Sequence, residues 1–366
     1  MSTPHLQIQD LHTYFFSKQR NAFIHSVNGV NMDVMKGETL GIVGESGSGK
    51  SITMMSVMGL ISANPGVLSG KVTLHGKNGA LDLLPDLDKY VEVEKENGKI
   101  VIARKDVHGW NKQVNRIMKN IWSKEVSMIF QNPKAAFNPF ETIGSQITEA
   151  IMLHTGITNK LEAKEKALYW LDKVKIDSPR LRYENYPYGL SGGMAQRAMV
   201  AMALASEPTL LIADEPTTGL DATIQSKIVD LLEELKASLG ITLILISHDI
   251  SVISRLSDKI AVMYGGNVLE HGLADQILDP HSKDKHPYTR ALLNSIPNEH
   301  NVLEGGYLMS IEGEVPDTID VPQGCRFFER CQSKTDAIRV KCAELNPGLF
   351  QLDAHHQSRC WLYDKK

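Results

Sequence analysis

A glycine-rich run, Gly44–Ser51, is the first feature whose residue types and spacing suggest chemistry. It fits the pattern G-x-x-x-x-G-K-[ST] and lies between the apolar stretch Thr39–Val43 and a helix-like stretch that begins at Lys50. Glycines let successive backbone N–H groups converge on an anion, and the new helix adds the partial positive charge of its first turn. Lys50 supplies a charge for the outer phosphates, and Ser51 supplies a hydroxyl for Mg²⁺. The pattern therefore predicts a nucleotide site made by Gly44, Ser46, Gly47, Ser48, Gly49, Lys50 and Ser51.

An apolar strand that ends in two carboxylates, Leu210–Glu215, is the second such feature. In a phosphate-loop fold we expect this strand to lie beside the loop strand, with Asp214 holding Mg²⁺ directly or through water. Glu215 would then orient or deprotonate the water that attacks the γ-phosphate. Two acids also commonly do no more than solvate a strand end, and it is the upstream loop that favours the functional interpretation.

A second glycine-rich turn, Leu190–Arg197, precedes the apolar helix Ala198–Ala205. The N-terminus of that helix offers a second phosphate cradle, which one nucleotide does not need unless the cradle serves a nucleotide held by another subunit. Two polar side chains also stand where strands end: Gln131 lies before the helical segment, and His248 follows Ile241–Ile246. Each is weak on its own, because a lone Gln or His at a strand end is usually structural.

The elements that must position these residues alternate between strand and helix, which predicts an α/β fold with a parallel sheet. We expect an edge strand from Leu6. The polar residues 77–124, broken by glycines, indicate an insertion with a small hairpin and a short helix. Helical periodicity dominates residues 143–188, strands return from Thr209, and the pattern decays into short pieces from about Pro280.

Composition excludes several classes of protein. The chain has 366 residues with 39 Lys and Arg against 43 Asp and Glu, so it has no global basic field for non-specific nucleic-acid binding. The longest apolar run, Ala198–Ala205, is far short of the roughly 20 residues of a membrane span, so we expect none. The first ten residues do not resemble a secretion signal, and four cysteines confined to the last 42 residues exclude a disulfide-stapled fold for the bulk of the chain.

In order and spacing, these motifs resemble the nucleotide-binding subunits of ATP-binding-cassette (ABC) transporters over about residues 6–275. The matching features are the phosphate loop, the glutamine loop at Gln131, the signature Leu190–Gln196, the acidic strand, the loop Gly219–Asp221 and the switch histidine His248. The resemblance implies a phosphate-loop (RecA-like) core with an antiparallel β subdomain and a helical subdomain at about 135–190. It divides the chain into an ATPase domain, 1–275, that carries the 77–124 insertion, and a C-terminal extension, 276–366.

The resemblance also assigns roles. Two cassettes face head to tail, so ATP bound by one meets Ser191 and Gly193 of the other. Gly192, Gln196 and Asp221 are further implied nucleotide-binding residues. Glu215, His248 and Gln131 are the implied catalytic residues, and Ser51, Gln131 and Asp214 the implied Mg²⁺ ligands. An aromatic residue near the first strand stacks on adenine in this family. Phe15 fits best by its offset, and Tyr14 is the alternative.

The four cysteines of the extension are Cys325, Cys331, Cys342 and Cys360. No C-x-x-C pair occurs, so a zinc ribbon or finger is a poor match. Four thiolates can still hold an iron–sulfur cluster, because folding rather than spacing sets the geometry. Four unligated cysteines are the alternative. His355 and His356 lie near Cys360 and could ligate a metal, but adjacent histidines in a polar loop are more often merely exposed.

Within the ABC family, the tail resembles that of oligopeptide and dipeptide importers. The segments that match are Phe137–Pro139, His286–Leu293, Gly324–Phe327 and Arg330-Cys331. In some members the cysteine tail binds a [4Fe–4S] cluster. Two features depart from the pattern: the gap between Cys331 and Cys342 is longer than usual, and so is the 77–124 insertion.

The resemblance implies an ATP-binding and hydrolysing subunit that powers oligopeptide or dipeptide import from the cytoplasmic face of the membrane. The implied partners are two transmembrane permease subunits, a second and distinct ABC ATPase subunit, and an extracytoplasmic peptide-binding protein. A permease would insert a short helix into a groove near Gln131. An importer of nickel or another small solute would share these motifs. A soluble ABC ATPase acting on DNA or ribosomes fits less well, because the chain has one set of motifs and no heptads between Lys50 and Asp214.

Overall fold

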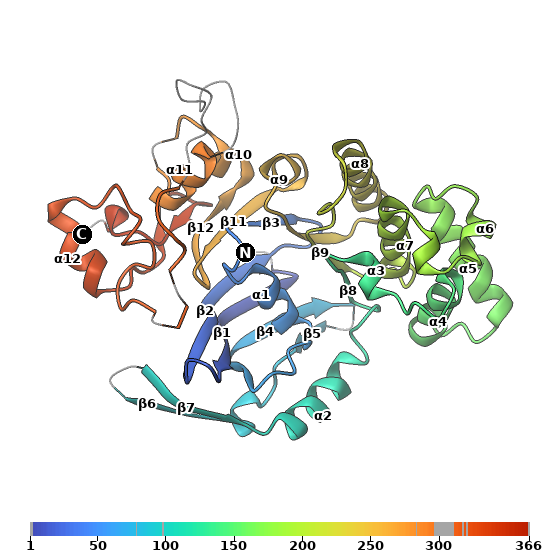
Figure 1. The fold of residues 1–366 in the computed structure, drawn as a ribbon, viewed down its shortest axis with the longest axis horizontal. Helices are drawn as coiled ribbons and strands as arrows, with labels where there is room; N and C mark the ends of the chain where they lie inside the picture. Colours follow the sequence, from blue (N-terminus) through green and yellow to red (C-terminus); the bar gives the residue numbers. More distant parts are fainter. Residues whose placement is uncertain are drawn as a thin grey trace.

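Figure 1 shows the fold of the chain in a computed structural model. It describes residues 3–77, 79–96, 99–282, 284–295, 311–316, 318–319 and 321–364.

A mixed sheet forms the centre of the molecule, in the order β13-β14-β12-β11-β3-β10-β9-β8. Its central strands pair in parallel and are buried, as their continuous apolar sequences require. The strands are β3 (Thr39–Val43), β8 (Val126–Ile129), β9 (Leu210–Asp214), β10 (Thr242–Ile246), β11 (Lys259–Tyr264), β12 (Asn267–Leu273), β13 (Phe350–Gln351) and β14 (Gln357–Ser358).

The order of these strands corrects one expectation about the acidic strand. β9 does not lie beside the loop strand β3, because β10 separates them. Parallel strands nevertheless end at the same edge of a sheet, so the loop after β3, the acids that end β9 and the histidine after β10 share that edge. An apolar run predicts that a strand is buried, but it does not say which strand is its neighbour.

A second, antiparallel sheet has the order β2-β1-β4-β5. Its strands are β1 (Leu6–Ser17), β2 (Ala22–Val34), β4 (Pro65–Gly76) and β5 (Gly79–Asp82). The expectation of an edge strand at Leu6 is wrong, because β1 pairs with both β2 and β4. The apolar face of this sheet packs with Leu40 and Ile42 of β3 and with Met54 of α1 (Lys50–Val57). The helix that follows the phosphate loop is thus held between the two sheets.

The 77–124 insertion contains the hairpin and the helix that its sequence predicts. β6 (Val91–Glu96) pairs with β7 (Lys99–Lys105), and α2 (Val107–Met118) follows. A short 3-10 turn, Leu87–Lys89, precedes the hairpin. The hairpin extends away from the body of the protein in Figure 1. α2 buries Trp110, Val114 and Met118 in the same core as β1 and α1, so its apolar stripe anchors the insertion.

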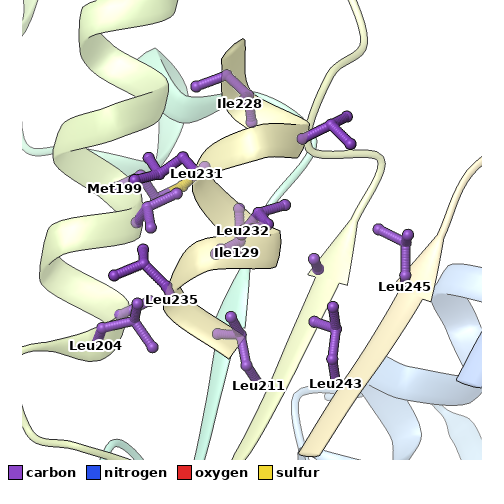
Figure 2. Packing of buried hydrophobic residues seen from close by; sticks show 14 of the residues in the cluster. Ile129, Met199, Leu204, Leu211, Ile228, Leu231, Leu232, Leu235, Leu243 and Leu245 are labelled. Atoms are coloured by element: carbon purple, nitrogen blue, oxygen red, sulfur yellow. The ribbon is translucent and has the colours of Figure 1, made fainter. Parts of the chain in front are cut away.

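The helical region lies at the opposite side of Figure 1 from the C-terminus. Two of its helices, α7 (Gly192–Leu204) and α8 (Ala222–Leu239), pack on the face of the central sheet over the acidic strand. In Figure 2, Met199 and Leu204 of α7 meet Leu231 and Leu235 of α8 above Leu211 of β9. The region comprises α3 (Pro133–Ala136), α4 (Ile143–Thr155), α5 (Lys160–Lys173), α6 (Pro179–Tyr183), a 3-10 turn (Pro187–Gly189), α7 (Gly192–Leu204) and α8 (Ala222–Leu239).

The C-terminal part extends the central sheet and packs against its edge. Tyr264 of β11, Tyr288 and Phe327 form a buried aromatic group with ring centroids 4.5–5.3 Å apart. Within the described ranges, no helix is long and apolar enough to cross a bilayer. The remaining helices are α9 (Ile250–Leu256), α10 (Ala274–Leu278), α11 (Pro287–Asn294), α12 (Asp336–Glu344) and the 3-10 turn Trp361–Tyr363.

The free energy of unfolding is expected to fall in mild acid because of His271 on β12. Burial lowers the pKa of this ring to about 4, from an ordinary value of 6.5. The unfolded chain therefore gains a proton below pH 6.5, whereas the folded chain stays neutral until about pH 4. The resulting loss is about 2 kcal/mol at pH 5. Urea unfolding at pH 7 and pH 5 should show a smaller loss in His271→Phe than in wild type, and equal losses would contradict this role.

Candidate nucleotide-binding site

The phosphate loop follows β3 and takes a conformation that only glycine permits at two positions. Gly44 has φ +151°, and a Cβ there would lie 2.1 Å from the carbonyl oxygen of Met263. Gly49 has φ +97°, and its Cβ would lie 2.3 Å from the carbonyl oxygen of Ser26. Any side chain at either position would displace neighbouring backbone, so the fold itself requires these two glycines of the motif.

Lys50, at the first turn of α1, is buried, and its ammonium group folds back onto the loop. Nζ donates to the carbonyl oxygens of Gly44 (2.8 Å) and Glu45 (3.0 Å). Burial lowers the pKa of Lys50, and the nearby carboxylates of Glu215 and Asp214 oppose that shift. The ammonium group is therefore held within the loop, close to where the outer phosphates of a nucleotide would bind.

Ser51 of the phosphate loop and Asp214 at the end of the acidic strand are in direct contact, although 163 positions separate them in the sequence. The Ser51 hydroxyl donates to Asp214 Oδ1 at 2.9 Å. Burial raises the pKa of Asp214, against the effect of this hydrogen bond. One hydroxyl and one carboxylate oxygen at this separation suit Mg²⁺, which binds oxygen ligands and usually takes the rest from phosphates and water. The residues present thus fit the metal that the sequence predicts.

Glu215 contacts both of the other predicted catalytic side chains, Gln131 and His248. Its Oε2 accepts from Gln131 Nε2 at 2.8 Å, and its Oε1 lies 3.4 Å from His248 Nδ1. Its backbone has φ +47°, an uncommon conformation for a residue other than glycine. Thr218, which the sequence analysis did not identify, also donates to Oε2 at 2.8 Å. Its only sequence signal is a position three residues after Glu215 in the same turn.

The signature turn forms a separate, exposed surface. Ser191 caps α7 by accepting from the N–H of Met194 at 3.3 Å, and Asp221 caps α8 in the same way. Both capping residues are exposed. A Cβ on Gly193 would meet Ile224 at 2.7 Å, so this turn packs closely against α8. Gln196 lies on the same helix but is buried, so its side chain is not part of the exposed surface that Ser191 presents.

The two candidate aromatic residues for adenine differ in exposure. Tyr14 is buried, stacks on His25 with ring centroids 4.0 Å apart, and donates to Asn28. It therefore has no free face for a base. Phe15 is half-buried against the core of the second sheet and stays the predicted adenine contact.

The four cysteines line one cavity of about 10 Å³, together with residues of α11 and α12. That volume suits about one water molecule and is smaller than a metal cluster. Burial raises the pKa of Cys325 to about 11 and that of Cys360 to about 12, so these are thiols in the present packing. Over the described residues, no group of three or more His, Cys, Asp or Glu side chains is arranged to hold a metal ion.

The expectation that both neighbouring histidines are exposed is wrong for one of them. His355 is exposed, but His356 is buried, and its Nε2 lies 2.7 Å from Glu270 Oε1. It does not line the cysteine cavity. The contact between His356 and Glu270 instead joins the extension to β12. The polar sequence around His356 is typical of an exposed loop and gives no sign of this buried contact.

Comparisons with known proteins give family matches for two parts of the chain. Residues 27–218 match the family described as "ABC transporter", and residues 269–337 match "Oligopeptide/dipeptide transporter, C-terminal region". The chain is similar to the solved "Dimeric Structure of MJ0796, a Bacterial ABC Transporter Cassette". The TM-score is 0.56 at 23% identity, over 74% of this chain and 98% of that one. This likeness shows the cassette fold.

Curated relatives align over nearly the whole chain. The oligopeptide transport ATP-binding protein AppD of Bacillus subtilis is 39% identical over 99% of this chain and 97% of its own length. The dipeptide transport ATP-binding protein DppD of Escherichia coli K12 is 39% identical over 97% of this chain and 95% of its own. The chain therefore belongs to the ABC transporter family, and within it to the ATP-binding proteins of oligopeptide and dipeptide transporters.

Proposed function

We propose that the chain is the ATP-binding and hydrolysing subunit of a membrane complex that imports oligopeptides or dipeptides. The observation that carries the proposal is the meeting of Glu215 with Gln131 and His248 at the sheet edge that also holds Lys50 and Ser51. A carboxylate at that point can take a proton from water as the water attacks the γ-phosphate, and ADP then leaves.

The side chains divide the work on a bound nucleotide. Lys50 neutralises charge on the outer phosphates, and Ser51, Asp214 and Gln131 are the proposed ligands of Mg²⁺. The metal would supply further positive charge at the phosphates. His248 contacts the γ-phosphate in this proposal. Ser191, Gly192, Gly193 and Asp221 complete the corresponding site of a second cassette, and Phe15 lies against adenine.

We propose that the ATPase domain covers residues 1–275 and the extension residues 276–366. The two family matches, 27–218 and 269–337, support a boundary near this point. The helical subdomain would cover about 135–190, from α3 to the turn before α7.

An apolar groove beside Gln131 supports contact with a permease. The groove has a volume of about 310 Å³ and lies between β8, α4 and α7. Trp122, Met128, Phe130, Met199 and Met202 are among its lining residues. A short amphipathic helix can bury its apolar face against such a lining. We propose that each of two permease subunits docks one ATPase subunit at the cytoplasmic face of the membrane, with a distinct second ATPase and an extracytoplasmic binding protein completing the complex.

The extension is proposed to hold a [4Fe–4S] cluster on its four cysteines. The four cysteines line the same cavity, which supports this proposal. Binding a cluster requires the cavity to open and the thiols to lose their protons, because the present packing accommodates neither. Iron analysis of anaerobically purified protein tests it: four irons per chain support the cluster, and zinc or no metal contradicts it.

Peptide uptake tests the transport function. Cells that lack the chain should lose uptake of a labelled peptide and regain it with the wild-type chain but not with Glu215→Gln. Permease subunits should co-purify with the chain from membranes. Rescue of nickel uptake alone, or recovery of nucleic acid in place of permeases, would contradict the proposal.

A further inference from the structure

The C-terminal extension reaches the phosphate loop through a partly buried ion pair. Arg330 donates from two nitrogens to the two carboxylate oxygens of Glu45, at 2.8 and 3.1 Å. Glu45 is the residue after Gly44 in the loop. The Arg330 side chain is only 5% exposed and that of Glu45 26% exposed. A bidentate pair that is partly shielded from water is stronger and more directional than a fully exposed one.

The extension also holds the backbone of Glu45. Its N–H donates to the hydroxyl of Tyr288, on α11, at 2.9 Å. Tyr288 is fully buried, so this hydroxyl is in a fixed place. The carbonyl oxygen of the same residue accepts from Lys50 Nζ at 3.0 Å. The backbone of Glu45 is thereby fixed at its N–H by the extension and at its carbonyl oxygen by the lysine that we propose binds phosphate.

Arg330 is itself held rigidly. Its guanidinium group donates to the hydroxyl of Tyr264 at 3.2 Å and to the carbonyl oxygens of Ile311 (3.3 Å) and Glu312 (3.0 Å). Tyr264 ends β11, the neighbour of β3 in the central sheet. The contact with Glu45 therefore connects the loop to the sheet edge and to the extension at once, and does not depend on a mobile side chain.

We propose that Arg330 and Tyr288 are positioning residues for ATP: they hold the phosphate loop in its nucleotide-binding shape before ATP arrives. The inference rests on the proposed ATPase function and assigns the extension a part in it. A loop that is already ordered loses less conformational freedom on binding, so affinity for the nucleotide is higher. The alternative is that the contacts only fasten the extension to the cassette.

A double-mutant cycle on the full chain separates the two. Arg330→Met and Glu45→Gln should each raise the Kd for MgATP roughly tenfold. The double variant should be no weaker than either single one, because both remove the same pair. Tyr288→Phe, which deletes one oxygen, should raise Kd about threefold. In the assembled complex, KM for ATP should rise in the same proportion with kcat unchanged.

The matched control is Lys341→Met. It removes the Lys341–Asp364 pair (2.8 Å), which lies in the same extension but does not contact the loop, and it should leave Kd unchanged. A lowered unfolding midpoint with wild-type Kd in Arg330→Met and Tyr288→Phe would overturn the inference. If Arg330→Met does not fold, Tyr288→Phe decides alone. Failure of wild-type protein to bind MgATP would instead overturn the proposed function, so the two failures are distinguishable.

Discussion

Glu215→Gln is expected to lower kcat for ATP hydrolysis by about 100- to 1,000-fold while leaving the Kd for MgATP within a few-fold of wild type. The amide keeps the size of the side chain and one acceptor oxygen for Gln131 or Thr218. It does not accept a proton from water at neutral pH. In the proposed site, ATP binding depends on other groups, chiefly Lys50 and the loop backbone, so it should persist.

The measurement is steady-state ATP turnover by the assembled transporter, together with nucleotide binding by the purified chain. Glu233→Gln provides the control, because Glu233 is an exposed acid paired with Arg255 on α8 and α9, away from the site. It should retain wild-type turnover. Turnover within twofold of wild type in Glu215→Gln would refute the role of Glu215.

Ser191→Arg is expected to remove nucleotide trapping at a site that belongs to a different chain. Ser191 is exposed at the start of α7, so an arginine there leaves this chain's own Lys50 and Asp214 undisturbed. Its bulk and the loss of the capping hydroxyl would block contact with a triphosphate across the interface. We expect roughly tenfold less trapping of a photoreactive ATP analogue on the partner cassette.

Lys50→Met is expected to give the opposite pattern. It should reduce labelling of this chain by the ATP analogue and leave labelling of the partner cassette unchanged. Labelling of the two cassettes in the assembled complex, resolved by size, distinguishes the patterns. Loss of label on this chain in Ser191→Arg, with the partner unaffected, would contradict the shared-site arrangement. The isolated chain should bind MgATP normally in Ser191→Arg and weakly in Lys50→Met.

Local motifs were sufficient to predict which side chains lie together at the sheet edge. The glycines of the phosphate loop are explained by the close backbone contacts at Gly44 and Gly49. Glu215, Gln131 and His248 meet because each follows a parallel strand, and parallel strands end at one edge. Thr218 escaped prediction because a threonine in a turn carries no signal of the carboxylate it contacts.

Features that depend on neighbours in space were not predictable. Burial patterns did not reveal that β10 lies between β3 and β9, or that β1 is an interior strand. Residues 285 positions apart, Glu45 and Arg330, form an ion pair that no local pattern encodes. His356 is polar and lies in a loop, yet its burial follows from the strand that packs over it rather than from its own surroundings in the sequence.

The contacts of Arg330 and Tyr288 with Glu45 couple nucleotide binding to the docking of the extension in both directions. Thermodynamic linkage requires that any free energy the extension contributes to nucleotide binding is returned in full as tighter docking of the extension once ATP is bound. Cys331 directly follows Arg330 in the chain. Each cycle of ATP binding and release would therefore alternately strengthen and weaken the docking of the segment that carries Cys331.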